Sequence, residues 1–176
     1  YFTRNTYSLT VEFDTGIDSA TATVDGAAAP QTLYYEQEFS VTAVVSTGYN
    51  WASWNVEGTA PIGFVATTIS QTVQMGAGNV VLTAQATINQ YNLTINPNGG
   101  TYESDVLEIE RDYADTYEVL SVERDGYSFA GWTLQRDTID EALQNSPFGS
   151  FDPQTNIYTF GAGNDVLIAN WTPNRY

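Results

Sequence analysis

Acidic side chains are the most abundant chemically active groups in this sequence. It contains 21 Asp and Glu residues against 5 Lys and Arg residues, which gives a net charge of −16. Asp14 with Asp18, and Asp112 with Asp115, are pairs spaced closely enough to contribute to a calcium site. Calcium needs about six to eight oxygen ligands, and no EF-hand or nonapeptide calcium motif accompanies these pairs. The sequence therefore favours a solvated acidic surface and keeps calcium binding as the alternative.

Glycoside hydrolysis is the other chemistry that paired carboxylates support. Their spacing in the sequence does not fix their separation in space, and no insertion suited to forming a pocket surrounds a pair. The chain has no His and no Cys, which excludes Ser-His-Asp and Cys-His catalysis and the usual zinc, haem and iron–sulfur ligand sets. We therefore predict no catalytic residue, no cofactor and no enzymatic activity.

One aromatic motif occurs twice, as Gly-Tyr-Asn-Trp-Ala-Ser-Trp at 48–54 and Gly-Tyr-Ser-Phe-Ala-Gly-Trp at 126–132. Aromatic rings can stack on sugars, so a glycan platform is one interpretation. Large aromatic side chains also bury the most area in a small core, and this favours a structural role. We therefore assign the motif to the core, with Trp54 and Trp132 as its anchors, accompanied by Tyr49, Trp51, Tyr127 and Phe129.

The whole sequence repeats with a period of about 84 residues, which is typical of tandem modules. Tyr-Ser-Leu-Thr-Val at 7–11 corresponds to Tyr-Asn-Leu-Thr-Ile at 91–95, and Gly-Ala-Gly-Asn at 76–79 returns unchanged at 161–164. The blocks keep the same order in both copies. We expect the tail of a preceding repeat (1–6), two modules (7–90 and 91–175) and the first residue of a following repeat (176).

The elements expected to position these residues are mostly strands. Apolar residues alternate with polar ones from Tyr7 to Phe13, and the pattern returns at 91–95, as expected for half-buried strands. One short helix is predicted over 138–144, where Thr138 to Glu141 form a capping box ahead of Ala-Leu-Gln. The helix falls in an insertion of the second module, so it decorates the common framework.

Residues 91–172 resemble the internalin-type B repeat, also called the Listeria–Bacteroides repeat. They carry its Tyr-x-Leu-Thr strand start, its Gly-Gly turn at 99–100, its Gly-Tyr-x-Phe-x-Gly-Trp motif and its closing Ala-x-Trp at 169–171. Residues 7–86 are similar to the divergent form of the same repeat: they carry the aromatic motif at 48–54 but lack the Gly-Gly turn and end in Ala-Gln-Ala at 84–86. The resemblance implies tandem β-grasp-like modules of bacterial surface proteins that carry no catalytic residues.

Three functions fit a repeat that preserves core residues but no shared polar cluster. The leading hypothesis is an extracellular stalk or spacer at the cell surface, with neighbouring repeats of the same chain as its contacts. The alternatives are an adhesive module that binds a glycan or protein with exposed aromatics, and a subunit of a self-assembling fibre. The acidic surface argues against nucleic acid and anionic lipid as partners, and no apolar run is long enough for direct membrane insertion.

Overall fold

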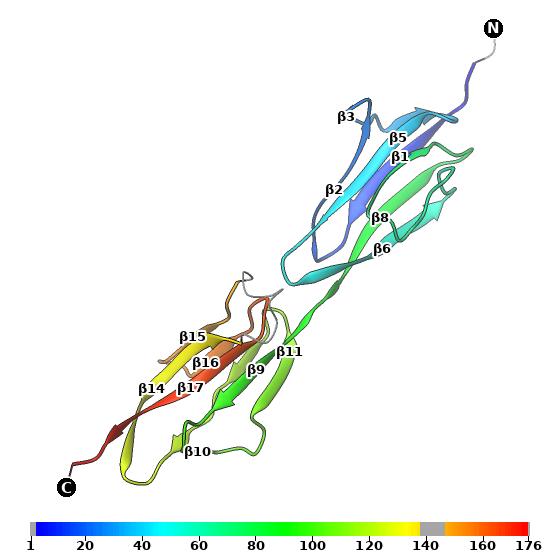
Figure 1. The fold of residues 1–176 in the computed structure, drawn as a ribbon. Coiled ribbons are helices and arrows are strands. Elements are labelled where there is room, and N and C mark those ends of the chain that lie inside the picture. The colour runs from blue at the N-terminus through cyan, green and yellow to red at the C-terminus, as the bar shows by residue number, and fades with distance from the viewer. Residues whose placement is uncertain (1–2, 138–146, 176) are drawn as a thin grey trace. The chain divides into compact units, whose positions relative to one another are not determined.

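The computed structural model describes residues 3–137 and 147–175, which form two compact units, and the chain passes from one to the other between Ile88 and Asn89 (Figure 1). Every regular element in these residues is a β-strand. This agrees with the mostly β class expected from the alternating sequence. Each unit is described below by itself.

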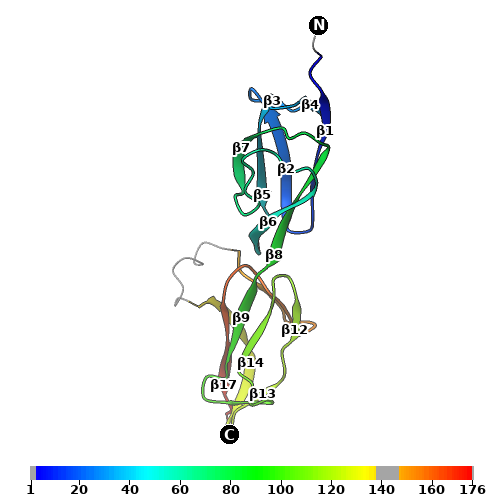
Figure 2. The ribbon, with the colours of Figure 1, turned by 90° about the vertical axis from the view of Figure 1, so that its right-hand side faces the viewer.

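The first unit packs two four-stranded sheets face to face (Figure 2). One sheet has the order β4-β1-β8-β6 and the other has the order β3-β2-β5-β7. The strands are β1 (Thr6–Phe13), β2 (Ile17–Val24), β3 (Ala27–Ala28), β4 (Thr32–Tyr34), β5 (Glu38–Val45), β6 (Tyr49–Gly58), β7 (Ser70–Gln74) and β8 (Val80–Ile88).

The core of the first unit lies between its two sheets. Phe39, Val41 and Ala43 of β5 are buried, whereas Thr42 between them is exposed, as a period of two requires. Leu82 and Ala84 of β8 face them from the other sheet and are also buried. Alternating apolar residues therefore produce a two-sided core without any helix.

The second unit is built on one four-stranded sheet of order β11-β9-β17-β14. A three-stranded sheet of order β12-β16-β15 and a small β10-β13 pair accompany it, and their buried residues join the same core. The strands are β9 (Gln90–Asn96), β10 (Thr101–Tyr102), β11 (Glu108–Asp112), β12 (Thr116–Glu118), β13 (Val122–Glu123), β14 (Tyr127–Arg136), β15 (Ser150–Asp152), β16 (Ile157–Thr159) and β17 (Asp165–Pro173).

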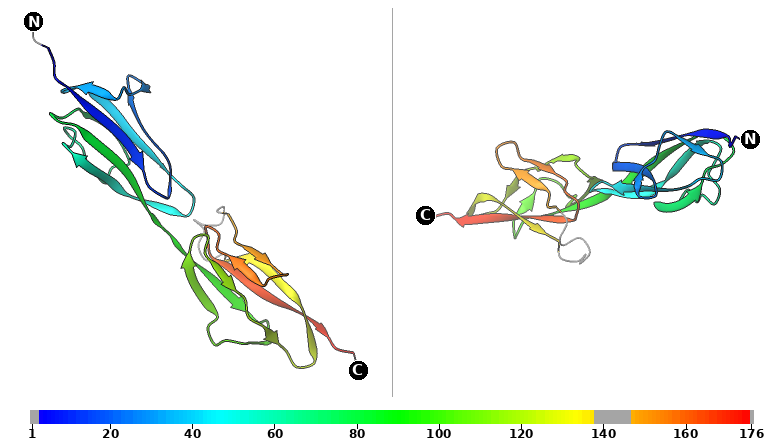
Figure 3. Two further views of the ribbon diagram at one scale, coloured as in Figure 1. Left: turned by 180° about the vertical axis from the view of Figure 1, so that it is seen from behind. Right: turned by 90° about the horizontal axis from the view of Figure 1, so that it is seen from above.

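In both units the first strand pairs in parallel with the last strand (Figure 3). The register of β1 with β8 runs from Leu9↔Val80 to Phe13↔Ala84, and that of β9 with β17 runs from Leu93↔Asp165 to Asn96↔Ile168. Because the paired strands run in the same direction, the chain enters each unit at one end and leaves it at the other.

The repeated Gly-Ala-Gly-Asn loop precedes the last strand and fixes this pairing. The Oδ1 atom of Asn79 accepts a hydrogen bond from the Ser8 N–H, and that of Asn164 accepts one from the Asn92 N–H, both at 2.9 Å. The backbone carbonyl of the same Asn accepts the N–H of Thr59 or Asp137, just after β6 or β14. One residue therefore joins three segments, which explains why this Asn occurs at the same position in the two units.

The β-grasp expectation is wrong for the first unit. A β-grasp needs a helix packed on the sheet, and residues 3–88 contain none, because the second sheet covers that face. In the second unit a sheet of three strands contributes to the core, and the described residues again include no helix. The helix predicted over 138–144 lies outside the described residues.

Substituting the loop asparagines tests their role as connectors. Asn79→Ala removes the acceptor of the Ser8 amide and should lower the free energy of unfolding of the first unit by about 1 kcal/mol. Asn164→Ala should do the same to the second unit. A urea titration followed by amide NMR spectra reports the two units separately.

Asn79→Asp retains an oxygen acceptor and should behave nearly as the parent chain does. Asn55→Ala, on the exposed face of β6, is the matched control. Equal destabilisation by the Asn79 and Asn55 changes to Ala would contradict the connector role.

Candidate functional site

The two acidic residues suggested as calcium ligands in the first unit bind neutral side chains. Asp14 accepts a hydrogen bond from Gln85 Nε2 at 3.1 Å, and Asp18 accepts one from Ser46 Oγ at 2.5 Å. Within residues 3–137 and 147–175 no three acidic side chains come together in a way that could hold a metal ion. Asp14 directly follows β1 and Asp18 lies at the start of β2, and each carboxylate bonds to a neighbouring segment.

The second acidic pair has the same character. Asp112 accepts a hydrogen bond from Gln90 Nε2 at 3.0 Å, which links neighbouring strands β11 and β9. The backbone of Asp115 donates to the Asp112 carbonyl at 3.1 Å and accepts from the Phe160 N–H at 2.9 Å. The pair closes the turn between β11 and β12 and does not converge on one point with a third carboxylate in the described residues.

The aromatic motif of the first unit is covered by the loop that follows β6. Trp54 is only 2% exposed, and its Nε1 donates to the Thr68 carbonyl at 3.1 Å. Trp51 is half-buried, and its Nε1 donates to the Thr67 carbonyl at 2.8 Å. The Gln71 side chain bonds to Val65 and Thr68 and so holds this loop in place.

The same motif in the second unit is more open. Phe129, at the position of Trp51, is 44% exposed, and Trp132, at the position of Trp54, is half-buried. Phe129 makes edge contacts with Trp132 at 5.4 Å and Trp171 at 5.7 Å between ring centroids. Assigning Phe129 to the core is therefore wrong. Its ring has no N–H with which to hold a covering loop, as Trp51 does.

Each unit has a glycine that allows an aromatic ring to approach the backbone. A Cβ on Gly16 would lie 2.3 Å from the Tyr49 ring, and a Cβ on Gly100 would lie 2.5 Å from the Trp171 ring. Tyr127 of the second unit is half-buried instead under the Arg124 guanidinium, whose Cζ lies 4.0 Å from the centroid of the Tyr127 ring. The Gly-Gly turn and the closing Trp of the second unit are thus one packing feature.

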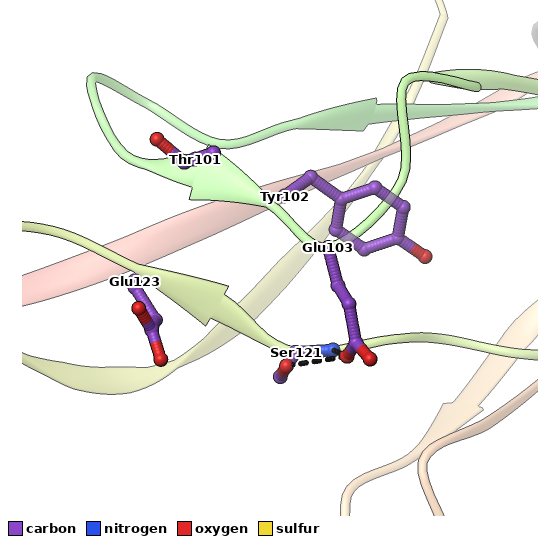
Figure 4. A pocket seen from close by; sticks show the side chains of 5 residues that line it. All are labelled: Thr101, Tyr102, Glu103, Ser121 and Glu123. Atoms are coloured by element: carbon purple, nitrogen blue, oxygen red, sulfur yellow. Dashed lines mark hydrogen bonds between the residues drawn. The ribbon is translucent and has the colours of Figure 1, made fainter.

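A hollow of about 260 Å³ lies beside the open aromatic rings. A second hollow of about 370 Å³ shares Ser121 with it and is lined by Thr101, Tyr102, Glu103 and Glu123 (Figure 4). The lining of the first hollow combines aliphatic, aromatic and polar side chains: Val119, Leu120, Ser121, Val122, Phe129, Trp132 and Asn156.

Hydrogen bonds fix the polar groups of the second hollow. Glu103 Oε2 accepts hydrogen bonds from Ser121 Oγ at 2.6 Å and from the Ser121 N–H at 3.4 Å (Figure 4). These two bonds hold the pKa of the exposed Glu103 carboxyl below its usual range. The Tyr102 hydroxyl accepts from the Leu120 N–H at 2.9 Å and lies 3.2 Å from the Tyr117 hydroxyl. Burial raises the pKa of Tyr102, so it stays a neutral phenol.

A buried ion pair distinguishes the second unit from the first. Asp165 is fully buried, its Oδ1 lies 3.4 Å from Arg136 Nε, and its Oδ2 accepts from the Tyr158 hydroxyl at 2.7 Å and the Gly149 N–H at 2.8 Å. Burial raises the pKa of Tyr158. Gly58, Val80 and Val73 occupy the corresponding positions of the first unit, so the cluster is a local structural feature.

The repeated strands and shared loop define a class of tandem all-β repeats, and comparison with known families names the class. The chain belongs to the divergent InlB B-repeat domain family, which matches it twice, over residues 9–90 and 91–175. The resemblance seen in the sequence is thereby confirmed. Families of this kind are typical of bacterial surface proteins.

A curated relative supports this assignment. The chain is 32% identical over 158 residues to a Gly-rich membrane protein of Evansella cellulosilytica, an alignment that covers 86% of this chain. The chain spans 16% of the length of that relative. No solved structure matches the chain significantly. In the residues that the structure describes, no helix is long and apolar enough to cross a bilayer.

The two copies of the aromatic motif should differ in their contribution to stability. Trp54→Ala should lower the free energy of unfolding of the first unit by about 3–5 kcal/mol, because the ring is fully buried. Phe129→Ala should cost the second unit only about 1 kcal/mol, because nearly half of the ring is exposed. Chemical denaturation of the full chain, followed by NMR signals of each unit, measures both changes. A loss for Phe129→Ala as large as that for Trp54→Ala would show that Phe129 is a core residue after all.

Proposed function

We propose that this chain is a non-catalytic, load-bearing spacer segment of a bacterial cell-surface protein. The observation that carries the proposal is the parallel pairing of the first and last strands in each unit. A pull on the two ends of a unit acts along these strands and loads their hydrogen bonds in shear. All bonds of the pair must then yield together, whereas a pull across a hairpin breaks them one by one.

Other features support a spacer. Each unit has its own hydrophobic core, so stability is roughly additive along the chain, as in other repeat arrays. The Gly-Ala-Gly-Asn loop, which recurs unchanged, joins the first strand of each unit to the loop before the last strand through its Asn side chain. The charge of −16 suits an exposed extracellular location, because it keeps neighbouring segments soluble and separate.

Single-molecule force spectroscopy on the full chain tests the proposal. Pulling at the two termini should give two separate unfolding events, one for each unit. The chain has no Cys, so an engineered disulfide is unambiguous. Glu12→Cys with Thr83→Cys bridges a register pair of β1 and β8. When oxidised, this bridge should shorten the unfolding event of the first unit by roughly 250 Å of extension, at about 3.5 Å per residue. Reduction of the disulfide should restore the full extension.

The matched control bridges a pair outside the parallel strands. Thr21→Cys with Thr42→Cys joins β2 to β5 and leaves the β1–β8 pair unlinked. This variant should unfold at the same peak force as the parent chain, with only a modest loss of extension. If the parent chain lengthens under load without distinct force peaks, the load-bearing role is rejected.

A further inference from the structure

The aromatic motif that the first unit covers is left open in the second. In the first unit, the indole N–H groups of Trp51 and Trp54 both bond to carbonyls of the loop after β6. In the second unit, the Trp132 indole N–H makes no hydrogen bond to a described residue, and the neighbouring Phe129 is 44% exposed. A stacking ring and a donor thus lie together at one hollow.

We propose that the second unit binds a neutral saccharide in this hollow, between β13 and β14, with Phe129 as the stacking ring. A sugar ring has a face of C–H groups that packs on an aromatic side chain and a rim of hydroxyls that need polar partners. The lining of the hollow includes the apolar side chains of Leu120 and Val122, while Ser121 and Asn156 supply polar groups. This combination of surfaces matches both parts of a sugar.

The hydrogen-bonding groups around the hollow favour hydroxyl donors. Glu103 accepts two bonds from Ser121, which fix its orientation and leave lone pairs of the carboxylate for a ligand. Glu123 lines the adjoining hollow, so a second carboxylate can accept bonds from a bound sugar residue. A saccharide offers many hydroxyl donors to such acceptors.

The same groups argue against two other ligand classes. The carboxylates of Glu103 and Glu123 and the net charge of −16 repel uronic acids and sulfated sugars. A proline-rich peptide also stacks on aromatic rings, but it presents mainly carbonyl acceptors and needs donors from the protein. The Trp132 indole N–H can meet only one such acceptor, whereas the carboxylates of Glu103 and Glu123 in the adjoining hollow call for hydroxyl donors, and therefore a neutral sugar is the better match.

NMR titration of the ¹⁵N-labelled full chain tests the proposal with defined probes. The neutral probes are cellotetraose, mannotetraose and N-acetylchitotetraose, the acidic probe is tetragalacturonate, and the peptide probe is a proline-rich decapeptide. At least one neutral probe should shift the Trp132 indole resonance and the Ser121 and Phe129 amides. Resonances of the Trp51 and Trp54 indoles in the first unit should not move.

Substitutions then identify the site. Phe129→Ala should weaken binding of that probe about tenfold, equivalent to ~1.4 kcal/mol, with the second unit still folded by its NMR spectrum. Glu103→Gln should weaken it several-fold, because the amide replaces one acceptor oxygen. Phe13→Ala is the matched control, since Phe13 is an exposed aromatic residue of the first unit. This variant should bind the saccharide probe with the affinity of the parent chain.

Several results would overturn the proposal. Failure of every neutral probe to shift the Trp132 and Phe129 resonances at saturating concentration would reject it. Unchanged affinity in folded Phe129→Ala would place the sugar elsewhere. Preferential binding of tetragalacturonate would contradict the charge argument, and binding of the decapeptide alone would identify the hollow as a peptide site.

Discussion

The parallel contact between strands from the two ends of each repeat is the constraint on which the rest of the fold depends. Parallel strands cannot be joined by a tight turn, so all intervening strands must form the path that connects them. In the first unit this path builds a second sheet, and in the second unit it builds a smaller sheet and a short strand pair. The Asn of the repeated loop fixes the strand register in both. The framework therefore stays constant while the covering layers differ.

Differences between the two units arise where the covering layer meets the shared sheet. Trp51 and Trp54 hold a loop with two indole hydrogen bonds, whereas Phe129 lacks an N–H and is partly exposed. The second unit adds Trp171, which fits only because Gly100 has no side chain. It also has the buried Arg136–Asp165 pair where the first unit has Gly58 and Val80, a change that specifies local geometry more than it adds stability. One repeat thus supports two different surfaces.

The sequence predicted the repeat because whole segments recur in the same order, and it predicted the strands because apolar and polar residues alternate along them. Identical Gly-Ala-Gly-Asn segments marked the connector loop, although its hydrogen bonds to Ser8 and Asn92 join residues more than 70 positions apart and are invisible in the pattern. The β-grasp expectation failed because it came from resemblance, and alternation alone does not say whether a helix or a sheet covers a strand. Phe129 was misplaced because its exposure depends on a loop contact made in only one unit. The acidic pairs were suggested by proximity in sequence, and the fold directs each to a different partner.

Native-state hydrogen exchange on the full chain measures most directly whether the parallel pair holds each unit together. The account predicts that amides in the paired parts of β1 with β8, and of β9 with β17, exchange only through complete unfolding of their own unit. Amides of edge strands such as β3 and β10 should exchange through smaller openings. If the parallel pairs exchanged through low-energy local openings while β2 and β5 stayed protected, the central role of the first and last strands would be contradicted.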